Sequence, residues 1–62
     1  MNWELYEIWA VGIDGSEDLI DTTKSLKEAR EIAKETLSED CVECVIYKED
    51  EDGELVEVEI VS

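Results

Sequence analysis

Residues 25–37, SLKEAREIAKETL, carry the one long helical pattern in the sequence and decide the fold. Ser25 and Glu28 have the spacing of a capping box, in which the serine hydroxyl accepts the Glu28 amide and the glutamate reaches back to the serine amide. The helix is therefore predicted to begin at Leu26. At 100° per residue, one arc of this helix is apolar enough to be buried against a sheet. Its members are Leu26, Ala29, Ile32, Ala33, Thr36 and Leu37.

Two strands are predicted before the helix. Residues 3–13, WELYEIWAVGI, are rich in β-branched and aromatic types and end at the turn pair Asp14-Gly15. Residues 19–23 form a second, short strand that pairs back on the first. The pattern leaves open which face of the first strand meets the helix. One face presents Tyr6, Ile8 and Ala10, and the other presents Trp3, Leu5, Trp9 and Val11.

Two more strands are predicted after the helix, at residues 41–48 and 55–61, joined by the acidic turn EDEDGE at residues 49–54. Gly53 supplies the positive φ that such a turn usually needs. Apolar residues alternate with polar ones along both strands, and we expect one set to face the helix. That set is Val42, Cys44, Ile46, Val56, Val58 and Ile60.

These elements predict a single α+β domain spanning residues 1–62, with the order ββαββ and a four-stranded, mostly antiparallel sheet carrying one helix on one face. The other face of the sheet is then open to solvent. If Ile8 points to the helix, this open face carries an aromatic and aliphatic patch rimmed by carboxylates, which is typical of an interface. If Trp9 points to the helix instead, it forms part of the core.

The composition excludes several classes of function. The chain has 62 residues and a net charge of −14, and five cations beside nineteen acids do not make a surface that attracts nucleic acid or anionic lipid. No histidine is present, which removes Ser-His-Asp and Cys-His catalysis, and no glycine-rich phosphate loop is present. We expect no catalytic residues, no cofactor and no enzymatic activity.

The two cysteines, Cys41 and Cys44, form a C-x-x-C motif on a predicted strand. Residues three apart on a regular strand point to opposite faces, so we interpret Cys44 as core packing and Cys41 as an incidental thiol. Two cysteines are too few for a disulfide framework. No apolar run approaches the length of a membrane span, and the first residues lack a signal-peptide pattern, so we expect a cytoplasmic protein.

The acidic turn resembles a calcium-binding loop only in part. With Gly53 as the loop glycine, Asp50, Asp52 and Glu59 fall at ligand positions, but Lys48 occupies the first one. The residues that follow are predicted to form a strand rather than the helix of such a site. We therefore predict no metal site.

The charge itself suggests a function. Residues 24–40 hold four of the five cations and only five of the nineteen acids, so the negative charge is concentrated on the two hairpins. This distribution favours a protein that binds and blocks a basic, nucleic-acid-binding surface of a partner, such as a nucleic-acid-binding enzyme, with carboxylates in place of phosphates. The residues predicted to bind the partner are Trp3, Glu4, Glu7, Trp9, Glu43, Tyr47, Asp50, Asp52, Glu57 and Glu59.

In size and charge, the chain resembles small acidic phage proteins that inhibit restriction or CRISPR effectors. The resemblance implies a nucleic-acid mimic that contacts protein and not nucleic acid itself. The alternative is a small structural or adaptor module, in which two copies form a homodimer through their open sheet faces. A third explanation, a salt-loving source, is less favoured because the chain keeps four lysines and six isoleucines.

Overall fold

The computed structural model describes residues 5–62 and contains one helix and four strands within them. The elements are β1 (Tyr6–Gly12), β2 (Glu17–Thr23), α1 (Leu26–Thr36), β3 (Cys41–Glu49) and β4 (Leu55–Val61). This is the predicted ββαββ order. The strands form one sheet in the order β2-β1-β3-β4, and every neighbouring pair is antiparallel.

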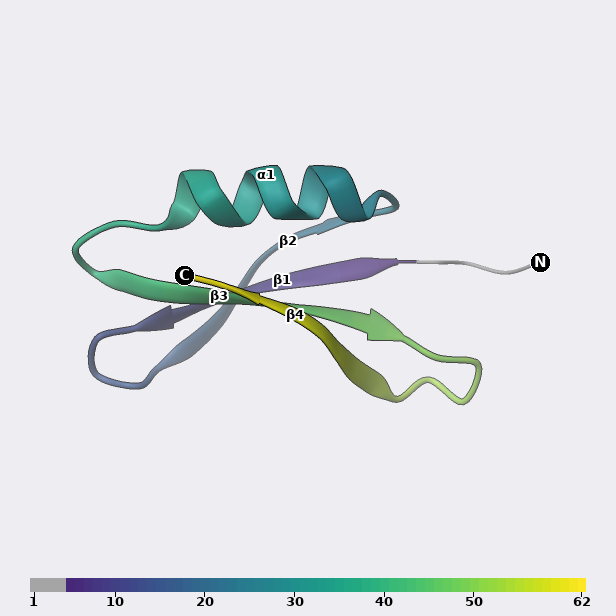
Figure 1. Cartoon of the computed structure of the whole chain (residues 1–62). Helices are drawn as coiled ribbons and strands as arrows, with labels where there is room; N and C mark the ends of the chain where they lie inside the picture. Colours follow the sequence, from purple (N-terminus) through teal and green to yellow (C-terminus); the bar gives the residue numbers. More distant parts are fainter. Residues whose placement is uncertain (1–4) are drawn as a thin grey trace.

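Helix α1 lies along one face of this sheet, and within residues 5–62 no other element covers the opposite face (Figure 1). The edge strands β2 and β4 cross at a wide angle in this view, which reflects a strong twist of the sheet. We call the uncovered surface the open face.

The helix begins at Leu26, as predicted, because Ser25 caps it. The Ser25 hydroxyl accepts a hydrogen bond from the Glu28 amide at 3.3 Å. The reciprocal half of the box differs from the prediction. The Thr23 hydroxyl accepts the Ser25 amide at 3.3 Å and donates to Glu28 Oε2 at 2.8 Å, so a hydroxyl links the two groups.

The core lies between α1 and the two central strands. Ile8, Cys44 and Ile46 are fully buried there against the helix. The centre of the buried helix face is Ala29 and Ala33, whose small side chains let the helix backbone approach the sheet closely. Because Ile8 faces the helix, with Tyr6 and Ala10 packed beside it, the question left open by the sequence is settled: Trp9 lies on the open face.

Three strands contain one extra residue each, which changes the face of the residues around it. The register passes from Ile8↔Asp21 to Trp9↔Leu19, from Val11↔Glu43 to Gly12↔Cys41, and from Ile46↔Glu59 to Tyr47↔Glu57. The residues left over are Ile20, Val42 and Val58. All three are apolar and between 39 and 50% exposed, because a bulged residue has no place in the packed face.

These irregularities overturn part of the predicted alternation. Val42, Val56, Val58 and Ile60 were all expected to face the helix, and all four are exposed. In β4 it is Val61 that packs against the core, opposite Cys44. The prediction of Cys44 as core packing is confirmed, but that of Cys41 as an incidental thiol on the other face was wrong. Both cysteines lie on the same face, because the extra residue Val42 shifts the alternation between them.

Candidate functional site: the open face of the sheet

An apolar row crosses the open face from one edge of the sheet to the other. Residues that pair across neighbouring strands lie on the same face, and the registers align one residue from each strand. The row is Leu19, Trp9, Val45 and Ile60, in the order β2-β1-β3-β4. With strands about 4.8 Å apart, it is roughly 14 Å long. The extra residues of the two edge strands, Ile20 and Val58, are also apolar and exposed.

This row has a buried centre and exposed ends. Val45 is only 5% exposed although no secondary-structure element covers it, whereas Leu19 and Ile60 at the edges are each 49% exposed. Trp9 pairs with Val45 on one side and Ile60 pairs with it on the other. The open face therefore has a small apolar cluster of its own, with its outer members available for contact.

Carboxylates flank the apolar row on both sides. One step along the strands, Glu17, Val11 and Glu43 form an acidic row, and one step the other way lie Thr22, Glu7, Tyr47 and Glu57. Residues two apart on a strand are separated by about 6.8 Å, so the two acidic rows are about 14 Å apart. The predicted residues Glu7, Trp9, Glu43, Tyr47 and Glu57 are thus brought together on one surface. The other members, Glu17, Leu19 and Ile60, were not predicted.

Trp9 and Tyr47 form the aromatic centre of this surface. Their rings pack edge to face, with centroids 6.4 Å apart and planes at 88°. Trp9 Nε1 donates a hydrogen bond to Glu7 Oε1 at 3.0 Å, which orients both side chains. Partial burial raises the pKa of Tyr47 above its ordinary value, and the negative charges of Glu17 and Glu57 raise it further. Carboxylates from both edge strands therefore act on the same phenol.

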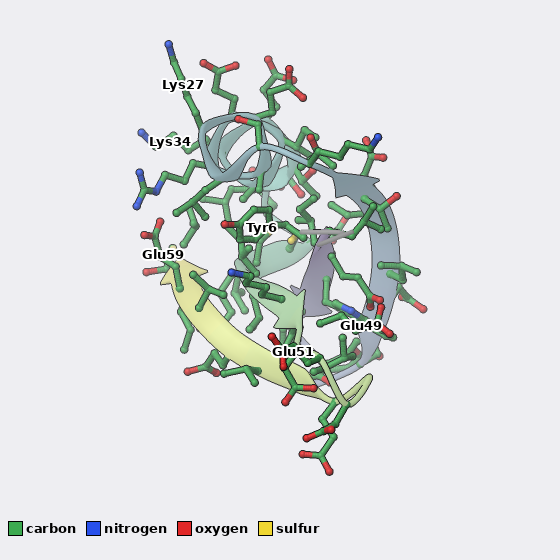
Figure 2. The ribbon with its side chains drawn as sticks, turned by 90° about the vertical axis from the view of Figure 1, so that its right-hand side faces the viewer. Tyr6, Lys27, Lys34, Glu49, Glu51 and Glu59 are labelled. Carbon is green, nitrogen blue, oxygen red and sulfur yellow. The ribbon has the colours of Figure 1, made fainter. Side chains whose placement is uncertain are left out.

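Glu59 was predicted to belong to this acidic surface, and that placement is wrong. The extra residue Val58 moves it to the helix face, where it accepts from Arg30 of α1. Arg30 Nε donates to both carboxylate oxygens, at 3.1 and 3.0 Å, and Nη2 donates to Oε1 at 2.9 Å. Figure 2 shows Lys27 and Lys34 on the same flank of the helix, above Glu59.

The acidic turn lies beyond the end of the sheet. Asp50 Oδ1 accepts the backbone amides of Asp52 and Glu54, each at 2.9 Å, so this carboxylate shapes the turn itself. Asp52 is exposed and extends the negative surface past β3 and β4. Gly53 has the positive φ predicted for it, 84°. Two further predicted residues, Trp3 and Glu4, lie outside the part of the chain that the structure describes.

Other kinds of site find little support. Within residues 5–62, no group of three or more cysteine or carboxylate side chains is arranged to hold a metal ion. Within the same residues, helix α1 lacks the length and apolarity that a membrane crossing requires.

The fold and the surface define a small open-faced ββαββ domain with an acidic, aromatic-centred sheet face. Comparison with protein-family models, curated proteins and solved structures gave no match for this chain.

The unpredicted residues were missed for different reasons. Glu17 alternates toward the open face with Leu19, but it lies before the predicted strand, residues 19–23. Leu19 lies within that predicted strand, but no face was assigned to it. Ile60 was assigned to the core because the extra residue in β4 leaves no mark in the alternation pattern. Apolar residues stand at every second position from Val56 to Ile60, but the extra residue Val58 prevents them from sharing one face, so this alternation could not by itself have revealed the second contact surface.

Proposed function

We propose that the protein is a non-catalytic binding module that occupies a basic, nucleic-acid-binding surface of a partner protein. The observation that carries the proposal is the apolar row of the open face between its two acidic rows. Apolar and aromatic anchors at the centre of an interface contribute most of the affinity. Complementary charges around them increase the association rate and exclude wrong partners.

The spacing of the acidic rows supports mimicry of a nucleic acid. The rows are about 14 Å apart, and the major groove that separates two lines of phosphates in B-DNA is about 12 Å wide. A partner that places lysine and arginine along both sides of a groove therefore finds a comparable pattern here. The resemblance in size and charge to phage inhibitors makes restriction and CRISPR effectors the first partners to test, in a cytoplasmic setting.

A homodimer through the open face is the second arrangement to test. The exposed ends of the apolar row, Leu19 and Ile60, would favour it. In a face-to-face pair, however, acidic rows of one copy would meet acidic rows of the other, and no cation of the sheet face would neutralise them. Sedimentation velocity distinguishes the cases, because a dimer held by apolar contacts becomes stronger at high salt.

The main experiment measures retention of a purified basic DNA-binding protein on the immobilised chain, with a duplex oligonucleotide as competitor. Two double variants remove the same charge from different faces: Glu43→Gln with Glu57→Gln on the open face, and Glu31→Gln with Glu35→Gln on the exposed side of α1. We expect the open-face variant to lose at least tenfold in affinity and the helix variant to bind like the wild type. Equal losses, or retention that the duplex does not reduce, would contradict the proposal.

A further inference from the structure

The extra residue in β3 creates a pair of neighbouring thiols. Gly12 pairs with Cys41 and Ala10 pairs with Cys44, so the two cysteines occupy consecutive inward positions although two residues lie between them in sequence. Their sulfur atoms are 3.8 Å apart. Both cysteines are reduced, and nothing in the proposed binding function uses them.

The surroundings of Cys44 favour uncharged sulfur. Cys41 Sγ donates to the carbonyl oxygen of Glu43 at 3.3 Å, and Cys44 Sγ donates to that of Ala33 at 3.5 Å. Burial, together with the hydrogen bond between the two thiols, raises the pKa of Cys44 to about 11. A metal bound by two thiolates would carry negative charge into this apolar space, beside carbonyl oxygens. A disulfide is neutral and keeps the space uncharged.

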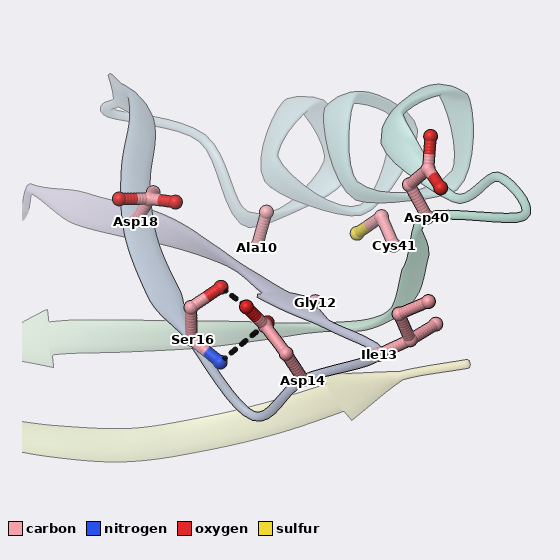
Figure 3. A pocket seen from close by; sticks show the side chains of 8 residues that line it. All are labelled: Ala10, Gly12, Ile13, Asp14, Ser16, Asp18, Asp40 and Cys41. Carbon is pink, nitrogen blue, oxygen red and sulfur yellow. Dashed lines mark hydrogen bonds between the residues drawn. The ribbon is translucent and has the colours of Figure 1, made fainter.

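Cys41 is the thiol that a reagent in solution reaches. It lines a surface hollow of about 460 Å³ between the β1–β2 turn and the start of β3 (Figure 3). Cys44 does not line this hollow and is fully buried. The other lining residues include Asp14, Asp18 and Asp40. Their carboxylates repel anionic reagents, including glutathione disulfide, and leave the hollow open to small neutral molecules.

We propose that Cys41 and Cys44 form an oxidation site that hydrogen peroxide converts to an intramolecular disulfide. Cys41 gives up its thiol proton, its sulfur attacks one peroxide oxygen, and the O–O bond breaks. Cys41 becomes a sulfenic acid, and the departing hydroxide takes up the thiol proton and leaves as water. The Cys44 sulfur then attacks the Cys41 sulfur, the S–O bond breaks, and a second water leaves with the Cys44 proton. Two thiols and one peroxide give one disulfide and two waters.

The backbone geometry allows this bond. The partners of the two cysteines on β1 are two residues apart, so the cysteine Cα atoms are about 6.8 Å apart, at the upper end of the range for disulfides. The sulfur atoms must close from 3.8 Å to about 2.05 Å. Rotation of the side chains supplies this movement. Closure breaks both thiol-to-carbonyl hydrogen bonds, including the one that joins Cys44 to α1.

The test treats the full chain with hydrogen peroxide and maps the product by mass spectrometry without reduction. Trypsin releases both cysteines on one peptide, residues 35–48. Met1, which peroxide also oxidises, lies on a different peptide. We expect this peptide to lose about 2 Da and to regain it with dithiothreitol. Cys41→Ser and Cys44→Ser remove the loss and leave either a sulfenic acid or a disulfide between two chains. Glutathione disulfide at equal concentration should react at least tenfold more slowly than peroxide.

A second measurement separates closure in the folded protein from closure in transiently unfolded chains. In the folded protein, the rate of disulfide formation should stay constant as urea is raised below the unfolding transition. A rate that rises in proportion to the unfolded fraction would overturn the proposal. So would a wild-type peptide that keeps both thiols, gains oxygen without the loss of about 2 Da, or forms only links between chains.

Discussion

The same substitution, isoleucine to alanine, should have very different effects on the two faces of the sheet. Ile8 is 0% exposed and packs between the sheet and α1, whereas Ile60 is 49% exposed and ends the apolar row of the open face. Each substitution removes three carbon atoms. The pair therefore holds the chemistry constant and changes only the side of the sheet.

The expected magnitudes follow from burial. Ile8→Ala loses about 2.4 kcal/mol of transfer free energy at about 0.8 kcal/mol per carbon, and the cavity brings the total to about 3–5 kcal/mol. Ile60→Ala loses roughly half of the transfer free energy and leaves no closed cavity, so about 1 kcal/mol is expected. A 62-residue domain has a total stability of about 3–9 kcal/mol, so Ile8→Ala brings the protein close to unfolding.

Thermal and urea unfolding followed by far-UV circular dichroism measure these differences. The midpoint temperatures of the two variants should differ by roughly 10 °C or more, since each kcal/mol moves a domain of this size by about 4–8 °C. Ile8→Val and Ile60→Val repeat the comparison at a milder cost, about 0.5–1.5 kcal/mol for the buried position. Equal destabilisation at the two positions would show that Ile60 lies under the helix and would refute the register assigned to β4.

Three further predictions test the charges of the molecule. Glu59→Gln breaks the ion pair with Arg30, and Glu57→Gln is the control that removes an acid from the open face. The first variant should unfold at a midpoint temperature a few degrees below that of the second. Equal midpoints would argue against the pairing. Raising the salt concentration from about 0.01 M to 1 M shortens the screening length from about 30 to 3 Å. Because the protein has a net charge of −14, its midpoint temperature should then rise by several degrees. An unchanged midpoint would speak against self-repulsion. The pKa of Cys44 is raised from 9.0 to about 11. The protonated thiol therefore makes its full contribution to the free energy of unfolding below pH 9, and this contribution is lost as the pH rises through 11. The free energy of unfolding should fall by up to about 1.4 kcal/mol per pH unit in this range. Cys44→Ala should flatten that slope, and a slope that persists in this variant would assign the loss to other groups.

The sequence predicted most of the fold because the local signals agreed with one another. The cap at Ser25 sets the start of the helix, and β4 has its predicted bounds, residues 55–61. Five of the ten predicted contact residues, Glu7, Trp9, Glu43, Tyr47 and Glu57, lie together on the open face. Whether they bind a partner is a prediction that the binding experiment tests.

The misplacement of Glu59, Ile60 and Cys41 has a single physical origin. In a regular strand the side chains alternate, and each extra residue shifts that alternation by one for all that follow. Val58 therefore sends Glu59 to Arg30 and leaves Ile60 on the open face, and Val42 places both thiols under the helix. These bulges depend on how neighbouring strands pair and twist, which no local pattern records.

By itself, the sequence determined the helix and its cap, the two hairpins, the uncovered sheet face and the concentration of acid on the strands. Each of these depends on residues close together in the chain or on composition. Only the tertiary structure decided that Trp9 lies on the open face, in an apolar row that Leu19 and Ile60 complete across all four strands. It also decided that the sulfur atoms of Cys41 and Cys44 lie next to each other. Those outcomes were decided by cross-strand register, because the hydrogen-bonded pairing of distant strands chooses which side chains share a face.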